Sequence, residues 1–177
     1  HSLADDISMA VKQPVRIVAP IPGKSTVAVE VPNKNREIVH FQELFHTKEA
    51  LESLNKMELP IFLGANIADE LMVRDLSQMP HLLIAGATGS GKSVCINSIL
   101  MGFLMTKFTE NVRLILIDPK MVELSCYEDI PHLLCPVVTD MKKAPGMLEW
   151  AIQKMDERYN LLAKAGARNI TAFNNLS

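Results

Sequence analysis

Eight consecutive residues constrain this chain more than any other feature: Gly86-Ala87-Thr88-Gly89-Ser90-Gly91-Lys92-Ser93. Their spacing, G-x-x-x-x-G-K-S, is the Walker A pattern of a phosphate-binding loop. The glycines allow successive backbone N–H groups to turn inward around an anion. We expect N–H groups of this loop to bind the α- and β-phosphates of a nucleotide at the first turn of a helix. Lys92 would reach the β- and γ-phosphates, and the Ser93 hydroxyl would ligate Mg²⁺.

The segments on either side of the loop match the structural context that this motif requires, a strand before it and a helix after it. Residues 82–85 are apolar and predict a buried parallel strand. Residues 94–105 are apolar almost all round, which is typical of a helix packed deeply against a sheet. Residues 112–118 predict a second buried strand, and the length of the connection favours a parallel crossover. Residues 133–138 resemble a third strand.

Asp118 follows the predicted second strand directly and is followed by Pro119 and Lys120. Ligands of open α/β sheets gather at the carboxyl ends of the strands, so Asp118 and Lys120 are expected at the functional edge. Four apolar residues and then Asp also match a Walker B aspartate. However, Pro119 follows, and no acidic residue comes before Glu123. A structural or coupling role is therefore favoured for Asp118, with the Walker B role kept as the alternative.

The pattern before the loop predicts a small α+β module over residues 3–57, followed by the phosphate-loop domain over residues 58–177. The module would contain a helix from Leu3, a hairpin of strands 15–19 and 26–31, a short strand at 38–41 and a helical stretch around 49–55. Two further strands, 59–64 and 70–76, would form a ribbon that leads to the phosphate loop.

A long helix is predicted near the end of the chain, with Thr139 or Asp140 as its N-cap. Its apolar residues recur at i, i+3, i+4 and i+7, so we expect this stripe to belong to the core and the charged face to be solvated. Gly166 is placed to end the helix in a left-handed conformation. No further strand follows, whereas a phosphate-loop sheet of this kind normally has about five strands. The sheet is therefore expected to be incomplete in this chain.

Composition bears on partners and compartment. The formal net charge is −2, which gives no electrostatic support for binding nucleic acid. The three cysteines lack C-x-x-C spacing and lie in apolar surroundings, which favours free thiols in a reducing cytoplasm. No apolar run reaches the roughly 18 residues that a membrane span needs, and no signal-peptide pattern is present.

Several segments, in order along nearly the whole chain, resemble the motor region of the FtsK/SpoIIIE DNA translocases. The first three, at residues 3–7, 15–24 and 29–33, resemble the α module of that family. Residues 79–86, 117–124 and 136–141 are also similar, as are Arg158-Tyr159 and residues 166–170. One departure is Ala87, where the family typically has Thr. This position contributes its backbone to the loop, so nucleotide binding is expected to survive.

The resemblance implies a RecA-like ATPase that hydrolyses ATP with Mg²⁺ and translocates double-stranded DNA in chromosome segregation coupled to cell division. It implies a bacterial, hexameric ring, anchored in the inner membrane by another segment, with this region cytoplasmic and with cell-division and recombination proteins as further partners. It also implies that Asp118 precedes the family's Walker B strand. Lys92 and Ser93 are the candidate catalytic residues, Ser93 is the Mg²⁺ ligand, and the candidate cofactor-binding residues are Gly86, Ala87, Thr88, Gly89, Ser90, Gly91, Lys92, Ser93, Val94 and Asp118.

Three other functions are compatible with the loop. A phosphate-loop motor that pumps protein through a secretion system would share the loop but not the α-module segments. A nucleotide kinase or switch GTPase would need an acceptor pocket or a base-reading motif, and the chain has no N-K-x-D. The fragment alone could also bind nucleotide without turning it over.

Overall fold

The computed structural model describes residues 3–19, 26–33, 35, 38–54, 56–66 and 70–176. The chain divides into two compact units, His1–His40 and Phe41–Ser177. The first unit contains helix α1 (Leu3–Val11) and strands β1 (Arg16–Val18) and β2 (Ala28–Glu30). The two strands pair antiparallel, and Arg16 lies opposite Glu30, with which it forms a 3.7 Å ion pair. The hairpin predicted from the sequence is confirmed.

The second unit begins with two short helices on an antiparallel ribbon. The helices are α2 (Phe41–Phe45) and α3 (Lys48–Leu54), and the ribbon strands are β3 (Pro60–Ala65) and β4 (Leu71–Asp75). Ala50, Phe62 and Val73 are buried together where the helices meet the ribbon. The ribbon is confirmed, but the strand predicted at 38–41 is wrong. Phe41 and Phe45 are one helical turn apart, and both rings contact Phe62.

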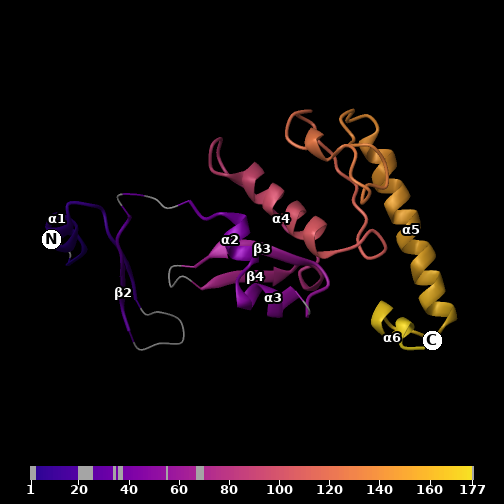
Figure 1. The fold of residues 1–177 in the computed structure, drawn as a ribbon, viewed down its shortest axis with the longest axis horizontal. Coiled ribbons are helices and arrows are strands. Elements are labelled where there is room, and N and C mark those ends of the chain that lie inside the picture. The colour runs from indigo at the N-terminus through magenta and orange to yellow at the C-terminus, as the bar shows by residue number, and fades with distance from the viewer. Residues whose placement is uncertain are drawn as a thin grey trace. The chain divides into compact units, whose positions relative to one another are not determined.

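Helix α4 (Lys92–Thr106) lies along the ribbon, as Figure 1 shows. Ile99 and Phe103 are buried against Ile61 of β3. Leu100 belongs to another cluster, which contains Leu116 and Val137. The helix therefore packs through its middle, at Ile99, Leu100 and Phe103, whereas Val94 and Met105 are exposed, so its burial is less complete than the apolar sequence predicts.

The predicted parallel pairing of residues 112–118 with 133–138 is present in a minimal form. Leu114 bridges Leu133 and Ile117 bridges Val138, both in parallel. The predicted strand at 82–85 is wrong, because in the described part of the chain this segment pairs with no strand. Leu83 is 92% exposed. A parallel strand is stabilised by paired neighbours and covered faces, whereas residues 82–85 have no described partner strand, and their packing against the cluster of Ile61, Ile99 and Phe103 comes from Ile84.

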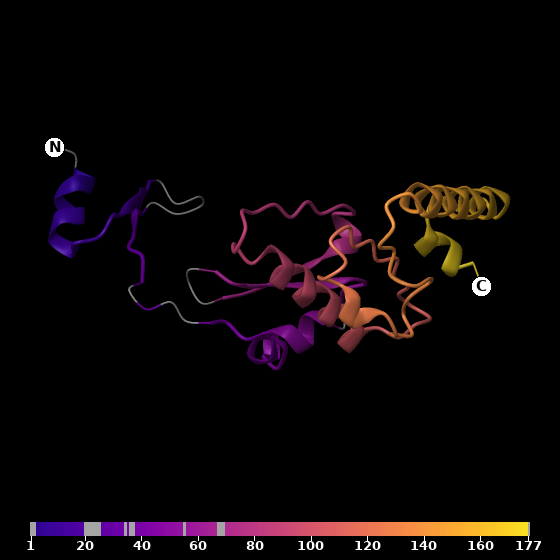
Figure 2. The same cartoon turned by 90° about the horizontal axis from the view of Figure 1, so that it is seen from above.

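Helix α5 (Ala144–Lys164) is followed by the short helix α6 (Ile170–Asn174). Figures 1 and 2 show the segment that links α4 to α5 lying between the two helices. The N-cap of α5 is Lys143, because Asp140 instead closes a separate turn by accepting from the Lys142 N–H at 3.0 Å. The predicted caps are therefore wrong, whereas the left-handed Gly166, at φ 67°, is confirmed.

The apolar stripe of α5 is exposed rather than buried, which corrects the prediction that it belongs to the core. Leu148, Ile152 and Tyr159 are between 54% and 60% exposed. The spacing correctly gives the face that is apolar, but none of the residues of α5 is buried. Among the residues that the structure describes, no helix combines the length and the apolar character needed to cross a membrane.

The packing of α2 and α3 crosses the domain boundary predicted at residue 57. Helices α2 and α3 lie before that boundary, yet they pack on β3 and β4, which lie after it. The boundary between compact units falls at His40 and Phe41 instead. The division at residue 57 stays a prediction about functional domains.

Candidate nucleotide-binding site

Residues 86–93 form an open loop at the start of α4. Gly89 and Gly91 have φ angles of 80° and 92°, a left-handed conformation that residues with a Cβ rarely adopt. Gly91 is also the N-cap of α4. A Cβ at Gly86 would collide with the hydroxyl oxygen of Ser90, so only glycine fits there without a shift. The pattern of glycines in the sequence is thus required by the shape of the loop.

The loop borders a cavity of about 380 Å³ that a second loop, residues 119–124, also lines. The lining is mixed in charge and includes both lysines that the sequence places near the site. Its residues are Gly86, Ala87, Thr88, Gly89, Gly91, Lys92, Ser93, Val94, Lys120 and Glu123. The predicted residues of the phosphate loop therefore gather around one cavity, except Ser90, whose side chain lies against Gly86.

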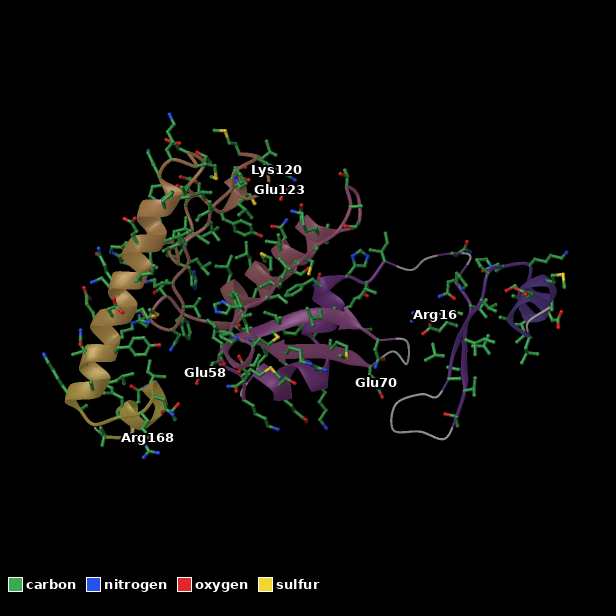
Figure 3. The ribbon with its side chains drawn as sticks, turned by 180° about the vertical axis from the view of Figure 1, so that it is seen from behind. Arg16, Glu58, Glu70, Lys120, Glu123 and Arg168 are labelled. Carbon is green, nitrogen blue, oxygen red and sulfur yellow. The ribbon has the colours of Figure 1, made fainter. Side chains whose placement is uncertain are left out.

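Glu123 is the acidic residue of this cavity and pairs with both lysines. Its carboxylate lies 2.6 Å from Nζ of Lys120 and 3.8 Å from Nζ of Lys92. Figure 3 shows Lys120 and Glu123 next to each other on the same loop. The hydrogen bond from Lys120 lowers the pKa of Glu123, and a hydrogen bond from Ser93 and the charge of Lys92 lower it further, whereas desolvation opposes them. Glu123 is therefore an anion at neutral pH.

Asp118 lies beneath the second loop and is only 2% exposed. Its Oδ1 accepts from the Lys120 N–H at 3.0 Å, and its Oδ2 accepts from the N–H groups of Glu123 at 2.9 Å and Leu124 at 3.0 Å. These bonds, chiefly that from Leu124, lower the pKa of Asp118, whereas burial opposes them. Both carboxylate oxygens thus hold the backbone of the loop that carries Lys120 and Glu123. The geometry favours the structural role for Asp118, and its contact with a nucleotide stays a prediction.

The sequence alone does not assign Glu123 to the site, because there it is only the first acidic residue after Asp118. The available signal was the position of the Asp-Pro-Lys-x-x-Glu segment at the end of a strand that follows the phosphate-loop helix. Residues just past such a strand lie at the edge where the phosphate loop also lies.

The fold and the loop together define an α/β protein with a RecA-like phosphate-loop fold. A solved structure, described as the pCW3 conjugation coupling protein TcpA in its monomer form with ATPgS, is similar with a TM-score of 0.61 and 19% sequence identity. The similarity covers 98% of this chain and 46% of that chain, and at this identity it supports the fold alone.

The family follows from two sequence models. Residues 46–177 match the model of the FtsK/SpoIIIE family, and residues 1–33 match that of the FtsK alpha domain. The chain belongs to the FtsK/SpoIIIE family. This confirms the resemblance found in the sequence.

The relatives of this chain include proteins named DNA translocase FtsK. That of Caldanaerobacter subterraneus subsp. tengcongensis is 52% identical over 174 residues, which is 98% of this chain and 24% of the relative. Those of Clostridium tetani and Pseudomonas syringae pv. tomato are 51% and 50% identical over 175 residues. This chain spans only 23% and 22% of these two proteins.

Proposed function

We propose that this chain is part of an ATP-driven motor that translocates double-stranded DNA in chromosome segregation coupled to cell division. The observation that carries the proposal is the cavity formed by residues 86–94 and 119–123 in a chain about half identical to proteins named DNA translocase FtsK. Because the chain corresponds to about a quarter of such proteins, the activity belongs to the intact protein. The isolated segment need not be active.

The residues of the cavity fit a Mg²⁺-nucleotide. The glycine backbone at residues 86, 89 and 91 leaves the loop open to phosphate oxygens, and the side chain of Lys92 is 32% exposed in the same cavity. Ser93 lies in the first turn of α4 and carries the hydroxyl expected to hold Mg²⁺. When bound, Mg²⁺-ATP supplies the phosphoanhydride bond whose hydrolysis drives movement.

Each residue has a defined part in this proposal. Backbone N–H groups between Thr88 and Ser93 bind phosphate oxygens at the helix N-terminus, where the dipole favours negative charge. Lys92 neutralises charge on the β- and γ-phosphates, and Val94 borders the nucleotide on the α4 side. These groups position the nucleotide, which is the main contribution of a protein to phosphoryl transfer.

The partners of the intact protein follow from the family. We infer a hexameric ring around duplex DNA, in which hydrolysis in the phosphate-loop domain changes its angle to the α module. Contacts to the DNA backbone would transmit the motion with little sequence preference. A net charge of −2 on this segment is compatible with such a ring, because basic loops elsewhere can line its pore. Attachment to the bacterial inner membrane and contacts with cell-division and recombination proteins belong to the same proposal.

The test is ATP hydrolysis by the intact protein to which this chain belongs, measured with and without long duplex DNA and compared with its Lys92→Ala variant. We expect DNA to stimulate hydrolysis strongly, and the variant to lose roughly 100-fold or more of the rate because a positioned charge is removed from the phosphates. Lys92-dependent hydrolysis that is indifferent to DNA would contradict the translocase proposal and support a motor that moves protein.

A further inference from the structure

The cavity proposed to bind phosphates already contains a carboxylate. Glu123 lines it together with Lys92 and Ser93, and its side chain is only 22% exposed. A carboxylate there repels phosphate oxygens, and the repulsion is screened less than on an open surface. An anion in this position needs a physical explanation that the phosphate-loop motif does not provide.

The contacts of Glu123 are to the groups that the nucleotide is expected to use. One carboxylate oxygen lies 3.8 Å from Nζ of Lys92, and Ser93 lines the same cavity and helps to lower the pKa of this carboxyl group. The other oxygen lies 2.6 Å from Nζ of Lys120. Glu123 therefore offers Lys92 and Ser93 an internal anion in the place where a phosphate is expected to interact with them.

The loop that carries Glu123 is held in a defined shape. Asp118 accepts hydrogen bonds from the backbone N–H of Glu123 and from both loop ends, at Lys120 and Leu124. Met121 has a φ of 63°, a left-handed conformation that residues with a Cβ rarely adopt. Such a conformation persists only where the surroundings enforce it. A change at Glu123 is thus expected to be felt through the whole of residues 119–124.

We propose that Glu123 is a positioning residue that competes with the nucleotide phosphates for Lys92 and thereby links occupancy of the cavity to the 119–124 loop. The inference rests on the proposed nucleotide site and adds a regulator to it. When a phosphate takes Lys92, Glu123 keeps Lys120 as its partner. The carboxylate thus sets how tightly the cavity holds its ligand.

The test is calorimetric titration of the full chain with ADP, once in EDTA and once with Mg²⁺. We expect Glu123→Gln to bind metal-free ADP roughly fivefold more tightly than the wild type, because a competing ion pair of this exposure contributes up to about that factor. Glu123→Asp keeps the charge and should bind closer to the wild type than to Glu123→Gln. A purely structural role predicts weaker binding in both variants.

Glu157→Gln is the matched control. Glu157 pairs with Lys154 at 2.6 Å and i,i+3 spacing, the same distance and spacing as the pair of Glu123 with Lys120, but on α5. It should bind ADP as the wild type does. If Glu123→Gln binds metal-free ADP as tightly as the wild type or more weakly, the inference about Glu123 is overturned, while the proposed nucleotide site is not. If the wild type binds no ADP in either buffer, the nucleotide site itself fails and the inference with it.

Discussion

Asp75 and Asp118 both accept backbone hydrogen bonds that hold a chain segment in place, but only the segment held by Asp118 lines the candidate site. Asp75, at the end of β4, accepts hydrogen bonds at 3.0 Å from the N–H groups of Glu58, Leu59 and Ser77. Asp118 accepts three bonds of the same length within 0.1 Å, from residues 120, 123 and 124. The difference lies in what each folded segment carries. Asp75 closes the ribbon, whereas Asp118 holds the loop that brings Lys120 and Glu123 to the cavity.

The comparison teaches that a carboxylate at a strand end is not by itself evidence of a metal or nucleotide ligand. The oxygens of Asp118 are already engaged by backbone donors, which is the reason that a buried carboxylate is tolerated there. We infer that its influence on the cavity passes through the backbone of residues 119–124, which its carboxylate oxygens hold.

The largest expected effect comes from replacing the two aspartates in parallel. Asp118→Asn loses charge-assisted bonds to the loop, so Lys120 and Glu123 are displaced from the cavity and ATP hydrolysis should fall roughly tenfold or more. Asp75→Asn should leave the rate per folded molecule unchanged and lower stability by about 1 kcal/mol, because an amide NH2 group replaces one of the two oxygens that accept from Glu58 and Leu59. Steady-state hydrolysis and urea unfolding measure the two effects. Equal loss of activity in both variants would contradict the claim that only Asp118 supports the cavity.

The next effect distinguishes the backbone of the two regions. Gly64 of β3 has a φ of 116°, and a Cβ built there meets nothing within 4 Å. Gly64→Ala should therefore destabilise the protein by about 1–3 kcal/mol through backbone strain alone, without changing nucleotide affinity. Urea unfolding and ADP titration of the same variant test this. A change in ADP affinity would mean that the ribbon contributes to the site after all.

A smaller effect is expected from pH. Burial raises the pKa of Asp75, but its hydrogen bonds with Leu59, Ser77 and Glu58 outweigh this and lower it below the ordinary 3.8. The pKa of Asp118 is lowered too, so both ionised carboxylates stabilise the fold above that value, and the contribution is lost as the pH falls below it. The free energy of unfolding should decrease between about pH 5 and pH 3, less steeply in each Asn variant. If the free energy of unfolding of a variant falls with pH as steeply as that of the wild type, the aspartate replaced in that variant does not cause the pH dependence.

The smallest effect is expected at Met121, which holds a left-handed conformation in the Asp118 loop. Met121→Gly removes the strain of the Cβ but adds entropy to the unfolded chain, so the net gain in stability should be about 0.5 kcal/mol. Thermal unfolding measures it. A large loss of stability would show that the exposed Met121 side chain makes contacts that the loop needs.

The sequence predicts those features that local chemistry decides. The phosphate loop, helix α4 after it and the left-handed Gly166 follow from glycine and lysine positions that few other structures require. The hairpin and the ribbon follow from alternation between turn residues. The predicted residues 86–94 also gather around one cavity, apart from Ser90.

Features that depend on distant partners were not predictable in the same way. The apolar run at 82–85 gives the character of a buried strand but not the neighbour that would pair with it, and Leu83 is exposed. The stripe of α5 likewise indicates a face for burial without supplying what covers it. Glu123 was missed because its role arises from the fold of residues 119–124, which brings it back to Lys92.

We infer that residues 86–93 and 119–124 form one nucleotide site. Hydrogen exchange of the full chain with and without Mg²⁺-ADP tests it most directly, because each loop has its own backbone amides to follow. We expect the nucleotide to slow exchange in residues 86–93 and to change exchange in residues 119–124, while exchange in the segment around Asp75 stays unchanged. Protection confined to residues 86–93, with the Asp118 loop unchanged, would contradict it.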